Sequence, residues 1–313
     1  MAKPISYVFA TPNPNATSTP TPFQPLAATP TPTIPPATAT PEFTATPEVR
    51  YWWTGLKKPE GQKLILVLGS DWRYGGGFRT DVIMLIALNP KDNTASVVSF
   101  PRDLYVTIPG VGQNRLNVAQ AYGGFELMAD TFELNFGVRP DYYIMTNFAG
   151  FVSIVNNVGG INVNASYNLT DKCDLPQASY DGYCSVGPGV VYMNGDTALW
   201  YVRSRYSSSD FDRTRREQEV IHALLAKLVS LNAVSRAPEL YNIYQSSVET
   251  NIGLDTVVSL VPMAPILIEK DAITRYYIGP QQVTSYTVPE NGAAVLLPNE
   301  EAVGAVLKAA LFE

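Results

Sequence analysis

The sequence predicts an α/β sandwich, because continuous apolar runs that suit buried strands alternate with segments whose apolar residues recur at helical spacing. Over 313 residues the chain is 46% hydrophobic and 16% charged, which is enough apolar material for one large domain or two ordinary ones. Near Trp52 the composition changes from a tract rich in threonine and proline to a globular mixture. We therefore expect a disordered stalk over residues 1–51 and a single globular domain over residues 52–313.

The stalk is predicted from repeated Thr-Pro and Ala-Thr pairs, since proline prevents regular helix and sheet. With no charge between Lys3 and Glu42, the tract should form an extended, semi-rigid spacer of the kind found at cell surfaces. The sequence holds no apolar run long enough for a membrane helix, and the opening MAKPISYVFA lacks the apolar region of a signal peptide. We expect an upstream membrane anchor that is missing from this chain. The alternative is a soluble protein with a disordered tail.

The strands of the globular part are predicted from four apolar runs that suit burial on both faces of a sheet. These runs cover residues 63–70, 81–88, 95–100 and 142–146. Helical spacing appears over residues 125–136, 148–157 and 212–231. The last part of the chain continues the same alternation of strand-like and helical segments without a linker, so we expect the globular part to be one domain.

Composition excludes two classes of function. The net charge of −6 and the isoelectric point of about 5.0 exclude the broad basic surface of a nucleic-acid-binding protein. One histidine, His222, and two cysteines exclude imidazole-rich metal sites and four-cysteine zinc sites. Cys173 and Cys184 lie in a stretch whose composition is typical of a loop. We expect them to close a small disulfide loop, which requires an oxidising compartment; the alternative is two free thiols.

Polar residues flank the predicted strands at four places, where α/β proteins place their ligands. If the strands before Asp71 and after Asp81 are antiparallel neighbours, these two carboxylates lie close together. Two carboxylates with phosphate oxygens and water are a typical Mg²⁺ arrangement, although either aspartate alone is better explained as a cap or turn former. The residues at the four places are Asp71, then Arg79 and Asp81, then Arg102 and Asp103, and finally the run from Arg203 to Gln218.

The arginines of these segments suit phosphate, because a planar guanidinium binds it through two hydrogen bonds. On a strand, Arg203 and Arg205 would point to the same side. Arg213 and Arg216 lie on the first turn of the last long helix, where backbone N–H groups also attract phosphate. The alternative is a solvated helix face whose arginines pair with nearby acids. That alternative explains Arg215, which we expect to face solvent.

Together these stretches resemble the LytR-CpsA-Psr (LCP) family of cell-wall glycopolymer ligases. The resemblance runs in the family's order from about residue 64 to residue 228. It implies an α-β-α sandwich with a central mixed sheet, located outside the cytoplasm in the cell envelope. The matching segments are ILVLGSDWR, FRTDVIMLIALNP, VVSFPRDLYVTIPG, RLNVAQAYGG, PDYYIMTNFAGFVSIVNNVGGINV and GVVYMNGDTALWYVRSRYSSSDFDRTRREQEVI.

The resemblance also implies a Mg²⁺-dependent phosphotransferase, with Mn²⁺ as a substitute, that moves a glycopolymer from a polyprenyl-pyrophosphate carrier onto peptidoglycan. We expect a monomer that meets the membrane surface through its lipid substrate and binds no nucleic acid. By position, Asp71 and Asp81 resemble the family's metal ligands. Catalysis would involve Arg102 and a base, either Asp81 or Asp103. The residues that resemble its pyrophosphate ligands are Arg79, Arg102, Arg203, Arg205, Arg213 and Gln218, where Gln218 departs from the commoner Arg-Gln order.

Two other functions fit the same residues. With water as the acceptor, the chain would be a polyprenyl-pyrophosphate phosphohydrolase. With no turnover, it would be a protein that binds polyprenyl lipids or regulates through them. The full set of aspartates and arginines favours an enzyme.

Overall fold

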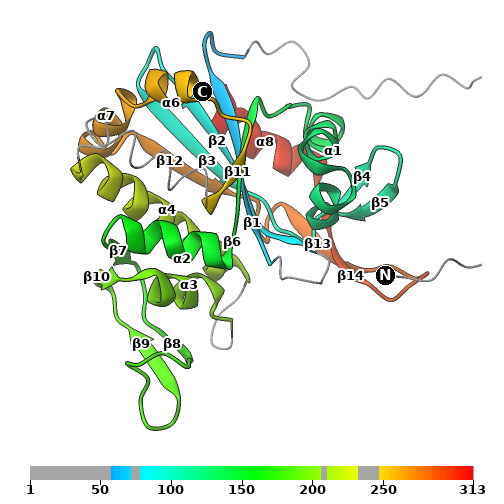
Figure 1. Ribbon diagram of the computed structural model, residues 1–313. Helices are drawn as coiled ribbons and strands as arrows, with labels where there is room; N and C mark the ends of the chain where they lie inside the picture. The colour runs from blue at the N-terminus through cyan, green and yellow to red at the C-terminus, as the bar shows by residue number, and fades with distance from the viewer. Residues whose placement is uncertain (1–57, 72–77, 206–209, 232–246, 313) are drawn as a thin grey trace, which may run out of the picture. The chain divides into compact units, whose positions relative to one another are not determined.

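The computed structural model describes residues 58–71, 78–205, 210–231 and 247–312 (Figure 1). The chain divides into two units, Met1–Glu48 and Val49–Glu313, and all the described residues belong to the second. The stalk predicted over residues 1–51 lies outside the described residues.

A six-stranded sheet forms the centre of the described domain (Figure 1). β1 runs antiparallel to β2 and parallel to β6, and β12 runs parallel to β3, so the sheet is mixed. The four strands predicted from apolar runs all lie in this sheet, which confirms the predicted mixed α/β architecture. The strand order is β11 (Glu249–Thr250), β6 (Tyr142–Asn147), β1 (Lys63–Ser70), β2 (Thr80–Asn89), β3 (Thr94–Ser99) and β12 (Ile273–Tyr277).

One face of the sheet packs against α1 (Ala119–Phe136) and α8 (Glu300–Leu311). Leu66 and Leu68 of β1 and Leu85 of β2 are fully buried in this core. Because successive side chains of a strand point to opposite faces, the core takes every second residue of each strand. The other residues of β1 and β2 face a second layer of helices.

The second layer consists of α2 (Phe148–Asn157), α3 (Gly195–Arg203) and α4 (Asp210–Ser230), on the opposite side of the sheet from α8 (Figure 1). These helices share a buried cluster with β7 (Ile161–Ala165) and β10 (Gly189–Met193). No residue of β1 or β2 belongs to that cluster. The layer is therefore stabilised by its own core, and its side toward the sheet is available for another purpose.

α2 and α3 both begin at an asparagine. The side-chain oxygen of Asn147 accepts a hydrogen bond from the amide of Gly150 at 2.9 Å, and that of Asn194 accepts one from Thr197 at 2.9 Å. Such caps satisfy backbone donors that have no partner within the helix. Glycine is needed at Gly150, because a Cβ there would lie 2.3 Å from the carbonyl oxygen of Ser247.

α1 is kinked near its start. Gly123 and Gly124 leave helical geometry, and Gly124 has φ 64° and ψ −160°, a region that essentially only glycine populates. The helix predicted over residues 125–136 is the part after this kink. The kink separates a short first turn, which contains Gln120, from the long part of α1.

The remaining elements lie around these layers. β8 and β9 form a hairpin that extends away from the helices (Figure 1), and a Cys173–Cys184 disulfide with Cα atoms 5.7 Å apart closes it. The remaining elements are β4 (Tyr105–Ile108), β5 (Gly112–Arg115), the 3₁₀ helix η1 (Leu116–Val118), β8 (Leu169–Lys172), β9 (Tyr183–Val186), α6 (Leu254–Leu260), α7 (Met263–Glu269), β13 (Val283–Thr287) and β14 (Ala294–Pro298).

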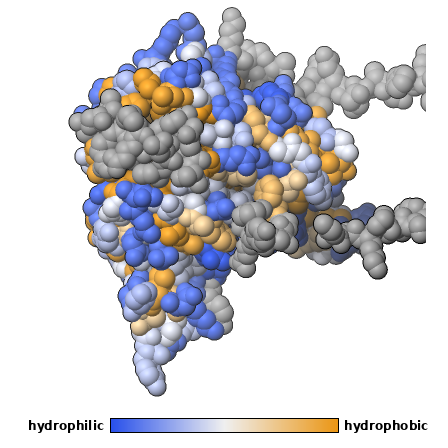
Figure 2. Space-filling model, viewed as in Figure 1, coloured by the Kyte–Doolittle hydropathy of each residue, from blue (hydrophilic) through white to orange (hydrophobic). Residues whose placement is uncertain are grey.

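The face of the molecule shown in Figure 2 carries hydrophobic residues in separate groups among hydrophilic ones. Val190 and Tyr192 of β10 and Val258 of α6 are among the exposed large hydrophobic residues. Within the described ranges, no helix combines the length and the apolar character needed to cross a bilayer.

Candidate functional site

A cavity of about 380 Å³ lies between the sheet and the second layer of helices. Its body is apolar and its rim is charged. The apolar walls come from alternate residues of β1 and β2 and from the facing sides of α2, α3 and α4. These wall residues are Val67, Val82, Met84, Phe148, Phe151, Leu199, Val202, Val220 and Ile221.

Two ion pairs form the rim at the ends of β1 and β2. Asp71 accepts hydrogen bonds from the backbone amide of Arg79 at 2.7 Å and from its guanidinium at 3.3 Å. The guanidinium of Arg102 donates to Asp81 at 2.7 Å. The two strands are antiparallel, as expected, so they bring Asp71 and Asp81 to the same cavity. A register shift between Gly69 and Ser70 accompanies this strand end.

Arg102 is held from two sides. Besides its bond to Asp81, its Nε donates to Asp103 at 3.3 Å. Asp103 in turn lies 3.4 Å from Nε of Arg115, whose guanidinium also donates to the carbonyl of Ala294 at 2.7 Å. Asp103 does not line the cavity. It positions Arg102 and does not reach the cavity directly, which makes Asp81 the better candidate for a base.

Three more arginines reach the rim from the end of α3, from the residues just after it and from α4. Arg203 ends α3 and lies over the ring of Phe148, with 4.3 Å between the guanidinium carbon and the ring centre. The expectation that Arg203 and Arg205 share one side of a strand is wrong, because the helix begun at Asn194 continues to Arg203. Both nevertheless line the cavity, as does Arg213 of α4.

Gln218 and Arg215 of α4 lie outside the cavity. The Gln218 amide donates to Ser99 Oγ at 2.7 Å and to the carbonyl of Tyr276 at 2.9 Å, so it joins α4 to the sheet edge. Of the residues expected to bind pyrophosphate, Gln218 is thus the one that the structure does not bring to this cavity. Arg215 pairs with Glu219 at 2.6 Å and is half-buried, so it does not simply face solvent.

Arg216 has a structural position. It is 1% exposed and donates to the backbone carbonyls of Tyr201 and Ser204, which tie α4 to the end of α3. Burial lowers the pKa of Arg216, and burial raises the pKa of Tyr201, whose hydroxyl donates to Glu219 at 2.6 Å. These contacts fix the backbone that presents Arg203 and Arg205.

The rim has a local excess of positive charge. Five arginines and three carboxylates line the cavity, an excess of two positive charges in a chain whose net charge is −6. Arg213 and Glu217 form a pair at 3.3 Å with side chains only 9% and 7% exposed. The cavity thus combines a cationic rim, suited to phosphate groups, with an apolar interior.

Seven residues of this cavity were predicted from the sequence, and others were not. The polar lining residues that were not predicted are Glu217, Ser70 at the end of β1, and the pair Thr146 and Asn147 at the end of β6. The signal for the pair was their position at the end of a buried strand, the criterion that identified Asp71. Those located are Asp71, Arg79, Asp81, Arg102, Arg203, Arg205 and Arg213.

A family model for LytR_cpsA_psr proteins matches residues 40–309. The chain belongs to this family. It is 33% identical over 196 residues to the polyisoprenyl-teichoic acid–peptidoglycan teichoic acid transferase TagU of Bacillus subtilis (strain 168). That match covers 62% of this chain and 61% of TagU, so the chain spans about three fifths of the length of the curated relatives it matches.

Solved structures of LytR_cpsA_psr proteins share the fold. The crystal structure of B. subtilis TagV aligns with a TM-score of 0.67 and 26% identity, over 82% of this chain and 98% of TagV. A structure of TagT bound to LI-WTA aligns with a TM-score of 0.62 and 28% identity, over 80% of this chain and 90% of TagT.

Proposed function

We propose that this chain transfers a glycopolymer from a polyprenyl-pyrophosphate carrier onto peptidoglycan in the cell envelope. The observation that carries the proposal is the continuity of an arginine-lined rim with an apolar cavity under the same strands. A substrate with a phosphate head and a hydrocarbon tail matches both parts at once. Two relatives support the same chemistry, because TagU is a teichoic acid transferase and TagT has been solved bound to LI-WTA.

Arg79, Arg102, Arg203, Arg205 and Arg213 would hold the pyrophosphate. Arg102 is the best oriented of them, because Asp81 and Asp103 fix its guanidinium on two sides. Fixed donors stabilise developing charge without reorganising during the reaction. Arg203, stacked on Phe148, would contact the phosphate at the entrance to the apolar interior.

Asp71 and Asp81 would hold Mg²⁺, or Mn²⁺ in its place. The donor set fits, because Mg²⁺ in such sites takes one or two carboxylates and fills its shell with phosphate oxygens and water. Within the described residues no group of three or more histidine, cysteine, aspartate or glutamate side chains is placed to hold a metal. The site would therefore need the substrate's oxygens as well. When bound, the ion supplies positive charge that stabilises the leaving phosphate.

In the proposed reaction a hydroxyl of the acceptor sugar attacks the phosphorus that carries the glycopolymer. The bond from this phosphorus to the bridging oxygen breaks, and polyprenyl phosphate leaves with the electron pair. The hydroxyl proton passes to Asp81, which lines the cavity, whereas Asp103 lies behind Arg102. The arginines stabilise the charge that gathers on the leaving phosphate.

The proposed location is outside the cytoplasm, at the membrane surface where the lipid carrier resides. The Cys173–Cys184 disulfide supports this location, because disulfides persist mainly in oxidising compartments. The family membership supports it as well.

The test is to incubate the full chain with a synthetic polyprenyl-pyrophosphate oligosaccharide and soluble peptidoglycan fragments, followed by mass spectrometry. The expected products are a fragment linked to the oligosaccharide through phosphate, and free polyprenyl phosphate. Free oligosaccharide phosphate as the only sugar product would indicate a phosphohydrolase. Bound but unchanged lipid would indicate a binding protein.

A further inference from the structure

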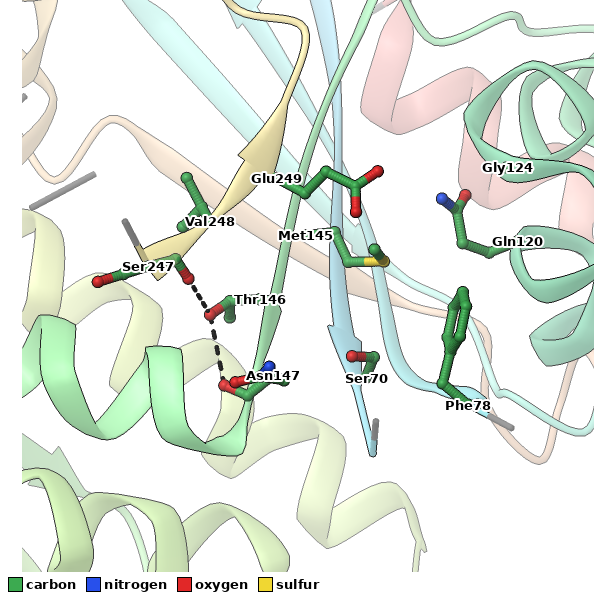
Figure 3. Close-up of a pocket in the computed structure, with 10 residues that line it drawn as sticks. All are labelled: Ser70, Phe78, Gln120, Gly124, Met145, Thr146, Asn147, Ser247, Val248 and Glu249. Atoms are coloured by element: carbon green, nitrogen blue, oxygen red, sulfur yellow. Dashed lines mark hydrogen bonds between the residues drawn. The ribbon is translucent and has the colours of Figure 1, made fainter. Parts of the chain in front are cut away.

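A second cavity, of about 510 Å³, lies on the other side of the ends of β1 and β6 (Figure 3). Ser70, Thr146 and Asn147 line both this cavity and the arginine-lined one. The two cavities are therefore neighbours, separated only by the ends of two strands. The first turn of α1 bounds the second cavity on one side, and the start of β11 bounds it on the opposite side.

Gln120 is the unusual residue of this cavity. Its side chain is 3% exposed, and its amide oxygen has no hydrogen-bond partner. Figure 3 shows the amide at the edge of the space between α1 and β6. A buried polar atom without a partner lowers stability, so its presence calls for a function. A ligand in this cavity would meet the amide group of Gln120.

The kink in α1 forms part of the wall beside Gln120. Gly124 lines the cavity with φ 64°, and no side chain covers the backbone at this point. Any other residue at Gly124 would be strained in this conformation. The sequence thus maintains an opening next to a buried amide that has no partner for its oxygen.

The opposite wall carries an acceptor. Glu249 points into the space across from Gln120 (Figure 3), and its Oε1 accepts a hydrogen bond from the Tyr143 hydroxyl at 3.0 Å. Burial and this hydrogen bond raise the pKa of Tyr143 to about 12, so its hydroxyl remains a donor to Glu249. Phe78 and Met145 add apolar surface between the polar groups.

The charge of this cavity distinguishes it from its neighbour. No arginine or lysine is among its described lining residues, and Glu249 is the one charged residue there. The carboxylate of Glu249 suits a ligand with hydroxyl or amide donors. A ring face or methyl group would contact Phe78 and Met145. A sugar unit that carries an acetamido group has all of these features.

We propose that the second cavity binds a neutral, acetamido-bearing sugar unit of the acceptor glycan, with Gln120 and Glu249 as its hydrogen-bond partners. This inference rests on the proposed function. The lipid-linked phosphate would occupy the first cavity. The acceptor hydroxyl would reach it past Ser70 and Thr146, at the shared strand ends.

The experiment is a calorimetric titration of the full chain with the tetramer of N-acetylglucosamine, a soluble and neutral probe. Replacing Gln120 by leucine should weaken binding about tenfold, and Glu249→Gln should weaken it by a similar factor, because each removes a partner from a buried site. The matched control is Gln113→Leu, on the exposed strand β5, which should bind as the unchanged protein does.

Thermal unfolding separates binding from folding. Gln120→Leu should unfold at the same temperature as the unchanged protein or higher, because it removes a buried oxygen without a partner. If Gln120→Leu does not fold, Glu249→Gln provides the binding test on its own. Equal affinity of the tetramer for the unchanged protein and Glu249→Gln, or no binding to either, would overturn the inference.

The transferase assay keeps this inference distinct from the proposed function. If the unchanged protein transfers and Gln120→Leu keeps its KM for the peptidoglycan fragment, the inference is wrong and the function stands. If no transfer occurs but the tetramer binds in a way that depends on Gln120, the function is wrong and the sugar site stands. The expected result is transfer with a KM for the fragment raised about tenfold by Gln120→Leu.

Discussion

The two faces of the central sheet are built from the same strands and serve opposite purposes. On the face toward α1 and α8, Phe100, Phe132 and Phe136 have ring centres 5.0 to 5.2 Å apart and pack in the main core. On the face toward α2, α3 and α4, the alternate residues of β1 and β2 line a cavity. Along the middle of β1 and β2, successive side chains point to opposite faces, so one set packs in the core and the other set borders the arginine-lined cavity.

The comparison shows why the helices α2, α3 and α4 do not close onto the sheet and fill the cavity. The helices of the second layer pack among themselves and with β7 and β10, so they gain little from closing onto the sheet. Arg216 further fixes the end of α3 through backbone carbonyls of Tyr201 and Ser204. The cavity is stabilised by its walls and does not need to be filled.

The largest expected effect is a difference in the free energy of unfolding between a substitution on the packed face and one on the cavity face. Phe132→Ala, on the packed face, should lower the free energy of unfolding by about 3–5 kcal/mol, because it removes a fully buried ring. Phe151→Ala, on the cavity side, should cost only about 1 kcal/mol, because its ring borders open space. Denaturant unfolding of both variants measures this. Equal losses would mean that the cavity face is packed like the core.

The second prediction concerns turnover on the hollow face. Asp71→Ala and Asp81→Ala should each remove divalent-cation dependence and reduce the rate at least about a hundredfold, because each removes a carboxylate from the proposed cation site. Both variants should unfold at nearly the temperature of the unchanged protein. Asp92→Ala, in the exposed turn after β2, is the control. Wild-type activity of either variant in EDTA would rule out this metal site.

The third prediction tests whether the rim binds pyrophosphate through defined contacts. Arg102→Ala, Arg203→Ala and Arg205→Ala should each lower kcat/KM about ten- to a hundredfold. This range corresponds to the free energy of one charge-assisted hydrogen bond to phosphate. Lysine at these positions should restore only part of the loss, because an ammonium cannot make two parallel hydrogen bonds. Arg215→Ala, outside the cavity, should change little. Equal losses at all four positions would indicate attraction by a diffuse positive field.

The smallest expected effect is a pH dependence of stability from His222. Burial, followed by repulsion from Arg275, lowers the pKa of His222, while Asp271 raises it. The unfolded chain then binds the proton more readily than the folded one, so stability falls as the pH drops below about 6.5. His222→Gln should flatten this slope, which is below about 1.4 kcal/mol per pH unit. Identical melting curves of both proteins between pH 7.5 and 5.5 would contradict the prediction.

The sheet and its neighbouring helices could be predicted from the sequence because their apolar runs are long and continuous. β1, β2, β3, β6 and α2 match the predicted ranges within a few residues at each end. The start of α1 could not be predicted, because two adjacent glycines disfavour helix and the short turn before them depends on tertiary contacts.

The site could be predicted where charge sits at a strand end. Asp71, Asp81 and Arg102 fit this criterion. The strand expected at Arg203 was a wrong assignment, because the helix cap at Asn194 outweighs a short stretch that also suits a strand. Gln218 of α4 bonds to Ser99 and does not line the cavity, a placement that depends on how the helix packs on the sheet and that the sequence does not show.

The placement of two cavities on opposite sides of the β6 end has a kinetic consequence. Thr146, whose hydroxyl donates to the Ser247 carbonyl at 2.8 Å, holds the partition between them in place. If the lipid-linked donor occupies one cavity and the acceptor sugar the other, as proposed, both substrates would bind before the reaction. Initial-rate plots at varied concentrations of both substrates should then intersect, as in a ternary-complex mechanism, and the phosphoryl group should pass between substrates without residing on the protein.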